Sequence, residues 1–452
     1  MSVHAPGTRW YNAVWRWHFY AGLFCIPFVI WLALTGAIYL WRPQIEGWLD
    51  RPYDHLATDG PVALPDAQVA AALRAVPGAA LRKYVLPDRP DQAVRILVGD
   101  HGVDKRVYVD PRSLAILKVT TEERRPMRVI FHLHGELLAG TAGSYLVELA
   151  ACWAIVMILT GVYLWWPRGR KGLAGLLYPR LKGGRRLFWR DIHATAGIWV
   201  SFFALCLILS GLPWAKGWGS YLNEVRTLTG TASGPVDWTI GGKAPPTEAM
   251  SGHTEHRGMA MPAPPTRPGE LARVIATVRP LAVAPPVLIA PPQRAGAPWK
   301  ISSDAADRPL RSDLKVDGAT GRLVNRVDFA QRHWIDRTIG YGVAAHEGAL
   351  FGIANQILGT LTAMFLIVLA VSGAIMWWRG RPIGLLGAPI PLSRPRFGAA
   401  LILAIVALGF YLPLFEATLI AMLALEFTLL RRWSVTQRWL GLRPVRAIDR
   451  RR

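Results

Sequence analysis

Four long apolar segments dominate the pattern of hydrophobic and polar positions along the chain. Each approaches or exceeds the roughly 20 residues with which an α-helix spans the hydrocarbon of a bilayer. Each also ends in Trp, a residue that collects at membrane interfaces. The pattern predicts four transmembrane helices within Phe19–Trp41, Tyr145–Trp166, Ile192–Trp214 and Ile353–Trp378.

A fifth apolar stretch lies near the C-terminus. Phe397–Leu430 contains neither Lys nor Arg, and Pro413 and Glu416 lie near its middle. Because Pro interrupts a helix, we expect a hairpin of two short helices here, at about 398–411 and 415–430. The chain is therefore expected to cross the membrane six times.

The distribution of charge predicts the orientation in the membrane. The chain has 52 Lys and Arg against 30 Asp and Glu, a net charge of +22. Four segments hold 22 of the basic residues and a single acidic residue, Asp449; they are 1–17, 168–190, 379–396 and 431–452. Cytoplasmic loops carry the excess of Lys and Arg. We therefore expect both termini in the cytoplasm, with 42–144 and 215–352 mostly outside.

The same distribution argues against a nucleic-acid-binding protein, the other class that a strongly basic chain suggests. The basic residues are spread over several loops instead of lining one groove-facing helix. Anionic lipid headgroups are the simpler expected partner. The first apolar segment is too long for the core of a cleavable signal peptide, so we expect it to be retained as an anchor.

The chain contains an internal repeat. Two spacings between a His and a Gly recur, one of 18 residues and one of 27. The pairs are His18/Gly36 and His193/Gly211 for the first spacing, and His134/Gly161 and His346/Gly373 for the second. Both copies begin on the cytoplasmic side, so we expect a pseudo-two-fold axis along the membrane normal.

Each copy also contains a segment with the pattern of a small α+β domain. In both segments a short helix precedes four strands. The helices are expected at 65–76 and 268–278, and the strands at 82–87, 93–98, 105–110, 115–120, 286–290, 298–302, 311–316 and 322–328. A linker rich in Pro, Gly and Met, 242–268, leads into the second segment.

The expected fold class is thus a membrane protein, mainly an α-helical bundle with an internal two-fold repeat, carrying two small α+β domains outside the membrane. The expected parts are 1–41 (N-terminal segment and first span), 42–130 (first outer domain), 131–167 (outer His segment and second span), 168–190 (basic loop), 191–214 (third span), 215–345 (linker and second outer domain), 346–379 (second outer His segment and fourth span), 397–430 (hairpin) and 431–452 (basic tail).

Four histidines at equivalent positions of the two copies are the candidate functional residues. His18 and His193 are expected at the cytoplasmic ends of the first and third spans, and His134 and His346 at the outer ends of the second and fourth. A two-fold axis would bring each pair face to face, and two opposed imidazoles suit the axial positions of a b-type haem. The sequence lacks the C-x-x-C-H motif of covalent haem attachment. We therefore expect two b-type haems, one near each membrane surface.

Two further residues have more than one interpretation. His132 lies two residues from His134 and has Ala344 at its repeat position; it is an alternative outer ligand, a partner of a haem propionate, or structural. Glu148 lies within the second span, where ionisable residues are commonly functional; it is a proton or hydrogen-bonding group, or structural. Small residues are expected to leave room for a flat macrocycle; they are Gly22, Gly36, Gly140, Gly197, Gly211 and Gly352.

Several motifs over roughly residues 10–380 together resemble a known family. They are His18 with Thr35-Gly36, Leu133-His134, Gly161-Val-Tyr-Leu-Trp-Trp-Pro-Arg168, Arg190-Asp-Ile-His193-Ala-Thr-Ala-Gly197 and Ser372-Gly-Ala-Ile-Met-Trp-Trp378. The sequence resembles the PepSY-associated transmembrane proteins, and among them the inner-membrane ferric-siderophore reductases of the FoxB type. This resemblance implies a bacterial inner-membrane location, PepSY-like periplasmic domains and reduction of iron chelates in the periplasm.

The expected function is electron transfer across the membrane. Electrons from a cytoplasmic donor or a membrane quinol would pass from the inner to the outer haem and then to a ferric siderophore, which releases Fe(II). Bis-histidine ligation favours electron transfer because it leaves no open site on the iron. Two alternatives stay open: a non-redox protein whose outer domains bind or regulate a partner, and a transporter built from parallel repeats.

Overall fold

The computed structural model describes residues 6–167, 172–182, 184–232, 267–389, 391–392 and 398–442. The chain divides into two compact units. Unit 1 comprises Met1–Ala37, His132–Thr229 and Ile357–Arg452, and unit 2 comprises Ile38–Phe131 and Gly230–Gln356. Most of the linker predicted at 242–268 lies outside the described residues.

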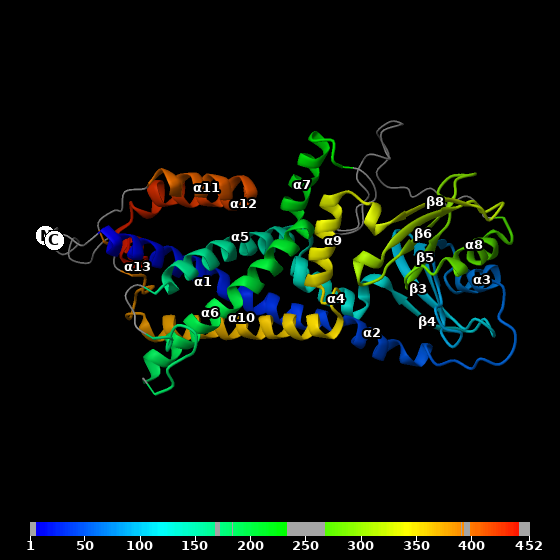
Figure 1. The fold of residues 1–452 in the computed structure, drawn as a ribbon, viewed down its shortest axis with the longest axis horizontal. Helices are drawn as coiled ribbons and strands as arrows, with labels where there is room; N and C mark the ends of the chain where they lie inside the picture. Colours follow the sequence, from blue (N-terminus) through cyan, green and yellow to red (C-terminus); the bar gives the residue numbers. More distant parts are fainter. Residues whose placement is uncertain are drawn as a thin grey trace. The chain divides into compact units, whose positions relative to one another are not determined.

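Unit 1 is built from helices (Figure 1). Its long helices are α1 (Pro6–Leu40), α5 (Gly140–Trp165), α6 (Arg185–Gly211) and α10 (Gly352–Gly380). Its shorter helices are α7 (Lys216–Leu228), α11 (Ala399–Tyr411), α12 (Pro413–Leu425), a π-helix (Glu426–Leu430) and α13 (Ser434–Trp439). The last residues of α1 (38–40) and the first residues of α10 (352–356) belong to unit 2.

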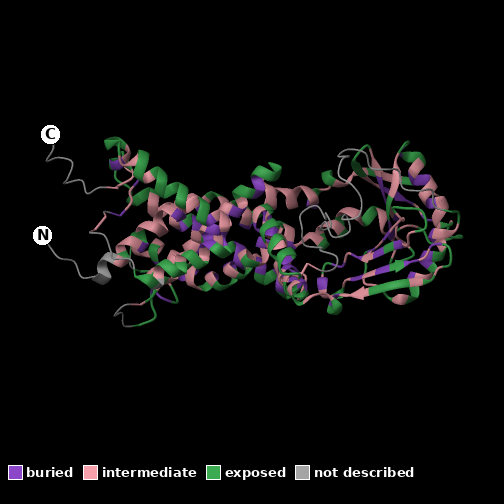
Figure 2. Cartoon of the chain, turned by 90° about the horizontal axis from the view of Figure 1, so that it is seen from above, coloured by how far each residue is buried: buried purple, intermediate pink, exposed green. Residues whose placement is uncertain are grey.

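Large apolar side chains cover the outside of these helices. Trp199 and Phe202 on α6 are 60% and 68% exposed, and Phe365 on α10 is also exposed. Figure 2 shows the buried positions concentrated between the helices of unit 1. A soluble protein does not expose so much contiguous apolar surface, so this surface is suited to contact with lipid tails.

Within the described residues, five helical segments are long and apolar enough to cross a membrane: Trp10–Leu40, Gly140–Trp165, Arg185–Trp214, Gly352–Gly380 and Pro413–Leu430. The sixth predicted span is wrong. Helix α11 has 13 residues, a length of about 20 Å at 1.5 Å per residue, whereas the hydrocarbon is about 30 Å thick. The chain is therefore a multi-pass membrane protein with five candidate spans.

The C-terminal hairpin packs against the second span. Leu412 connects α11 to α12 and is fully buried, and it lies in one apolar cluster with Cys152 of α5 and Trp218 of α7. The indole Nε1 of Trp218 donates to the carbonyl of Tyr411 at 2.8 Å. The hairpin is thus an integral part of unit 1, a placement that the sequence pattern left open.

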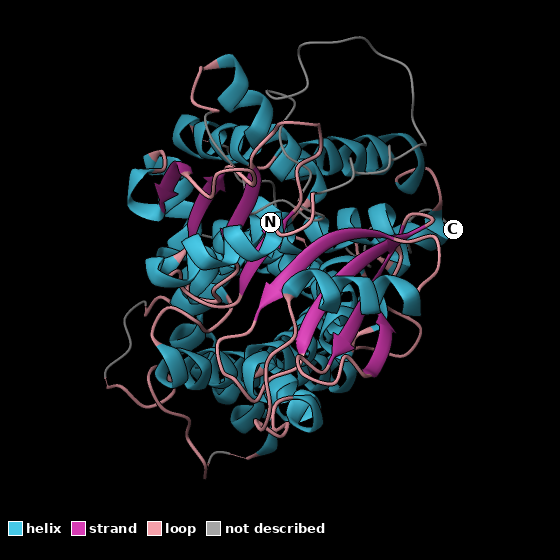
Figure 3. Ribbon diagram, turned by 90° about the vertical axis from the view of Figure 1, so that its right-hand side faces the viewer, coloured by secondary structure: helices cyan, strands magenta, loops and turns pink. Residues whose placement is uncertain are grey.

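Unit 2 contains one antiparallel sheet of eight strands with the order β4-β3-β2-β1-β5-β6-β7-β8 (Figures 1 and 3). The strands are β1 (Ala80–Leu86), β2 (Val94–Asp100), β3 (Val103–Val109), β4 (Ile116–Thr121), β5 (Val287–Ala290), β6 (Trp299–Ser303), β7 (Ser312–Val316) and β8 (Leu323–Asp328). The remaining helices of eight or more residues are α2 (Arg42–Asp50), α3 (Pro65–Ala75), α4 (Pro126–Glu136), α8 (Glu270–Val278) and α9 (Trp334–His346). Every predicted strand is present, with each boundary within two residues of the expected one.

The two outer segments share a single sheet and a single core, where the sequence suggested two small separate domains. Strand β1 pairs with β5, with Tyr84 opposite Ile289. The apolar faces of α3 and α8 lie over the sheet in one continuous core that includes Trp299, which is 1% exposed. A strand of each segment would otherwise leave an exposed edge, and pairing β1 with β5 removes both edges.

Candidate functional site

His18 lies inside the span formed by α1 and contacts the next span, α5. Its Nδ1 atom is 3.0 Å from the hydroxyl of Thr160. The following residue, Gly161, has no side chain where the imidazole approaches, and a Cβ there would lie 3.1 Å from Cε1 of His18. The helix α1 begins at Pro6, well before the apolar segment that the sequence pattern defines. His18 therefore lies within the helix, whereas the sequence pattern placed it at the cytoplasmic end of the span.

His193 repeats this arrangement between α6 and α10. Its Nδ1 lies 3.0 Å from the carbonyl oxygen of Leu369 and 3.2 Å from the hydroxyl of Ser372. A Cβ on the adjacent Gly373 would lie 3.3 Å from Cε1 of the ring. His193 too lies within its helix, because α6 begins at Arg185.

His134 makes the same type of contact at the far end of α1. Its Nδ1 is 3.0 Å from the hydroxyl of Thr35, and a Cβ on Gly36 would lie 3.1 Å from its Cε1. The indole of Trp31, one turn earlier on α1, donates to the carbonyl of Leu133 at 3.0 Å. Three histidines thus each rest on a hydroxyl residue followed by glycine.

The direction of these hydrogen bonds fixes the position of the imidazole proton. The single hydroxyl proton of Thr160 is directed to the carbonyl of Val156 at 2.8 Å, and that of Thr35 to the carbonyl of Trp31 at 2.9 Å. Each hydroxyl therefore accepts from Nδ1. For His193 the carbonyl of Leu369 can only accept. For His18 and His193 this arrangement places the proton on Nδ1, so that Nε2 carries the lone pair with which an imidazole binds a metal. His134 has the same Nδ1 contact.

His18 and His193 are brought together within unit 1. Their ring centres are 6.4 Å apart, with an angle of 81° between the ring planes. An iron held between two imidazoles, with metal–nitrogen distances of about 2 Å and about 1 Å from each nitrogen to its ring centre, separates the ring centres by about 6 Å. The spacing and the Nδ1 protons of this pair fit the axial ligands of a haem.

The other predicted ligands are placed as follows. His346 is the last residue of α9 and belongs to unit 2, whereas His134 belongs to unit 1; their pairing remains a prediction. His132 lies on α4, and its Nδ1 is 3.0 Å from the carboxylate of Glu136 one turn later. Of the two neighbouring histidines, His134 shares the hydroxyl–glycine contact of His18 and His193, so it is the better candidate for the outer ligand.

The glycines near the histidines accommodate protein side chains. Besides Gly36, which meets His134, Gly22 faces the sulfur of Met157 and Gly197 faces Leu369. Gly140 and Gly352 have positive φ angles and begin α5 and α10, a backbone conformation that glycine adopts without strain. At Gly140 and Gly352 no atom lies within 4 Å of an added Cβ, so the expectation that these small residues leave room for a macrocycle stays a prediction.

The comparison with known families covers most of the chain. The family described as PepSY-associated TM region matches residues 15–380, a stretch that runs from within α1 to the last residue of α10. The chain belongs to this family. No curated protein matches the sequence.

The PepSY-associated chain has no conventional metal cluster in its described part. No three or more His, Cys, Asp or Glu side chains gather there into a group that could hold a metal ion. A haem iron takes only axial ligands from the protein, so a pair such as His18 and His193 is the type of site that suits a haem.

Glu148 has a structural partner that sequence reasoning did not identify. Its side chain is 2% exposed, and the carboxylate accepts the backbone N–H of Gly217 at 2.8 Å. Gly217 is the second residue of α7, so the carboxylate lies at the N-terminus of that helix, where negative charge is favourable. A Cβ on Gly217 would lie 2.8 Å from both carboxylate oxygens. In this PepSY-associated protein Glu148 therefore fastens α7 to the second span.

Replacing Glu148 with Ala is expected to loosen α7. The buried N–H of Gly217 would lose its acceptor, which costs about 1–3 kcal/mol. Hydrogen exchange of the α7 amides should become faster in the full-length protein. The control is Glu224→Ala, which removes an exposed carboxylate from the same helix. Equal exchange in both variants would show that Glu148 does not hold the helix.

Asp191 anchors the basic segment before the third span. Its carboxylate is almost fully buried and accepts from Arg180 at 2.7 Å and from Arg190 at 2.9 Å. Arg190 thus has a protein partner, and it lies three residues before His193. The contact with Arg180 ties the segment before α6 to that helix two residues before His193.

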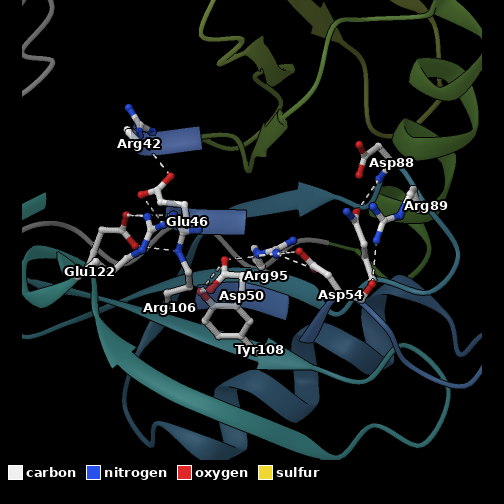
Figure 4. Close-up of polar contacts among 12 residues, drawn as sticks. Arg42, Glu46, Asp50, Asp54, Asp88, Arg89, Arg95, Arg106, Tyr108 and Glu122 are labelled. Atoms are coloured by element: carbon white, nitrogen blue, oxygen red, sulfur yellow. Dashed lines mark hydrogen bonds and ion pairs between the residues drawn. The ribbon is translucent and has the colours of Figure 1, made fainter. Parts of the chain in front are cut away.

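A network of alternating charges joins α2 to the first half of the sheet in unit 2 (Figure 4). Glu122 accepts from Arg106 at 2.8 Å and from Arg125 at 2.9 Å. Burial alone would raise the pKa of Glu122, but the two guanidinium groups outweigh it and hold that pKa below its usual value. Arg95 similarly pairs with Asp54 at 2.7 Å. The partners are satisfied within the unit, so this network is structural.

Proposed function

We propose that this membrane protein is an oxidoreductase that uses two b-type haems to carry electrons to ferric siderophores outside the membrane, where Fe(II) is released. His18 and His193 would hold one haem, and His134 and His346 the other. The proposal includes the finer assignments that the resemblance implies: a ferric-siderophore reductase of the FoxB type, PepSY-like outer segments and a location in the bacterial inner membrane.

The observation that supports this most strongly is the pair formed by His18 and His193. Two imidazoles on different spans lie 6.4 Å apart, and the Nδ1 of each is engaged by its own neighbour. Histidines that bind a metal through one nitrogen almost always donate a hydrogen bond from the other. A structural role would require no such common orientation of the rings.

The second haem is inferred from the repeat. His134 has the same Nδ1 contact as His18 and His193. In the second copy His346 precedes Gly373 by the same 27 residues that separate His134 from Gly161. When bound, such groups supply one-electron transfer without an open coordination site. The protein's part would be to orient the imidazoles, keep Nε2 deprotonated and exclude water from the bundle.

The direction of transfer rests on the charge pattern. Basic residues gather in the first turns of α1, from the end of α5 to the first turns of α6, around the end of α10 and after α12. The positive-inside rule assigns these positions to the cytoplasm. Both termini would then be cytoplasmic, with the donor there or in the quinol pool. The sheet of unit 2 would lie on the outer side, where a ferric siderophore would arrive.

A reoxidation experiment tests the proposed activity. The purified protein is reduced with a limiting amount of dithionite, mixed anaerobically with ferric siderophores of the hydroxamate and catecholate classes, and followed by its visible spectrum and by an Fe(II)-specific dye. We expect reoxidation and Fe(II) release together with at least one class. His134→Ala should slow both strongly, whereas His101→Ala, which removes a highly exposed histidine, should not.

Failure to reoxidise with any ferric chelate, in a protein that does contain haem, would refute the substrate assignment. It would favour a different acceptor on the outer side. A protein without haem would instead favour the non-redox or transporter alternatives.

A further inference from the structure

Three histidines in unit 1 rest on a Ser or Thr followed by Gly, and these two-residue steps share one geometry. The steps are Thr35-Gly36 on α1, Thr160-Gly161 on α5 and Ser372-Gly373 on α10. In each, the hydroxyl lies 3.0–3.2 Å from Nδ1 of a histidine on another segment. The glycine next to it lies opposite Cε1 of the same ring.

We propose that Thr160, Thr35 and, beside the carbonyl of Leu369, Ser372 are positioning residues. Their hydroxyl groups would set the tautomer of the histidine ligands and thereby the reduction potential of each haem. This inference rests on the proposed haem function and goes beyond it, because it assigns a separate task to residues that touch no haem. The hydroxyl would determine which ring nitrogen carries the proton, and the glycine would determine how closely the ring can approach its helix.

Each of these hydroxyl groups can only accept a hydrogen bond from its histidine. Its proton is used by a carbonyl of the preceding turn of its own helix, at 2.8 Å for Thr160, 2.9 Å for Thr35 and 3.0 Å for Ser372. The oxygen can then serve the histidine only as an acceptor. A Thr or Ser whose hydroxyl donates to its own helix is thus only an acceptor for the histidine, and it favours the imidazole that is protonated on Nδ1.

The glycine sets the distance. With a Cβ in place of the hydrogen, the nearest ring atom would lie 3.1 Å away at Gly161 and Gly36, and 3.3 Å away at Gly373. These values are tighter than ordinary carbon–carbon contact of about 3.5–4.0 Å. An alanine would therefore push each ring away from its hydroxyl and lengthen the Nδ1 hydrogen bond.

The electronic consequence follows from the hydrogen bond. An Nδ1–H group that donates to an oxygen makes the imidazole a more basic ligand through Nε2. A more basic axial ligand favours the ferric state, so it lowers the reduction potential of the haem. Loss of the acceptor oxygen should raise that potential.

The test is a potentiometric titration of the full-length protein in detergent, followed by its visible spectrum. Thr160→Val keeps the volume of the side chain but removes the oxygen, and Ser372→Ala removes the other hydroxyl. Thr160→Val should shift the midpoint potential of one haem upward. Ser372→Ala should shift the same haem in the same direction but by less, because Nδ1 of His193 keeps the carbonyl oxygen of Leu369 at 3.0 Å as an acceptor. Thr35→Val should shift the other haem upward instead. Thr160→Ser keeps a hydroxyl and should restore a potential close to that of the unmodified protein.

A control separates this effect from general damage. Thr362→Val also removes a hydroxyl from α10, where that hydroxyl donates to the carbonyl of Leu358, and neither potential should move. Unchanged potentials in Thr160→Val and Ser372→Ala, with both haems retained, would overturn the positioning role while leaving the proposed function intact. Shifts of two different haems by these two variants would also overturn it. If the unmodified protein contains no haem, the proposed function itself fails.

Discussion

Replacing His193 with Ala should remove one of the two haems and leave the other. The imidazole of His193 supplies one of two axial ligands, and a haem with one ligand left in a packed bundle is held far more weakly. The ratio of haem to protein should fall from two to one, measured by extraction of the haem into pyridine against the protein concentration. His101→Ala, at a highly exposed histidine, should keep both.

The assignment of His18 and His193 to one haem also predicts the haem content of double variants. His18 and His193 lie 6.4 Å apart and would serve the same haem, so the double Ala variant should lose no more haem than either single variant. Combining His193→Ala with His134→Ala should remove both. If the double variant of His18 and His193 loses two haems, the two imidazoles serve different sites and the assigned pairing is wrong.

Replacing Trp299 with Ala should strongly destabilise unit 2. The indole is 1% exposed at the centre of the shared core, and its Nε1 is 3.4 Å from a carboxylate oxygen of Glu270. Truncation of a buried Trp costs about 3–5 kcal/mol because it leaves a cavity. Hydrogen exchange in the intact protein should become faster in β6 and also in β1, because one core underlies both halves of the sheet.

The matched control is Trp48→Ala, since Trp48 is 71% exposed in the same unit. Its removal should change stability by no more than about 0.5 kcal/mol. Faster exchange confined to β5–β8 in the Trp299 variant would show that the two halves of the sheet unfold independently. That result would contradict a common core.

Much of the fold could be predicted because its signals are local. The alternation of apolar and polar residues predicts each strand, and Trp at the end of each long apolar segment marks the four longest spans. The pairing of β1 with β5 could not be predicted, because Tyr84 and Ile289 are far apart in sequence and nothing local distinguishes a shared sheet from two separate ones. The span wrongly predicted at α11 has another cause. The bounds of this helix were predicted to within one residue, but its 13 residues are too few to cross the hydrocarbon.

The candidate site was predictable in its residues but not in its contacts. The repeat identifies His18, His193 and His134 together with the glycines that recur at fixed spacing. The sequence does not reveal that His18 contacts Gly161 and not Gly36, because those contacts join different helices. Glu148 was ambiguous for the same reason, since its partner Gly217 lies in a helix that begins after the following span.

Haem content of the unmodified protein tests the central claim most directly. The full-length protein is purified from cells supplied with haem precursor, and its absorption spectrum is recorded before and after dithionite. The account predicts two b-type haems per chain, with sharp reduced bands typical of two histidine ligands and no change on adding carbon monoxide. A folded, colourless protein, or one whose reduced spectrum responds fully to carbon monoxide, would contradict it.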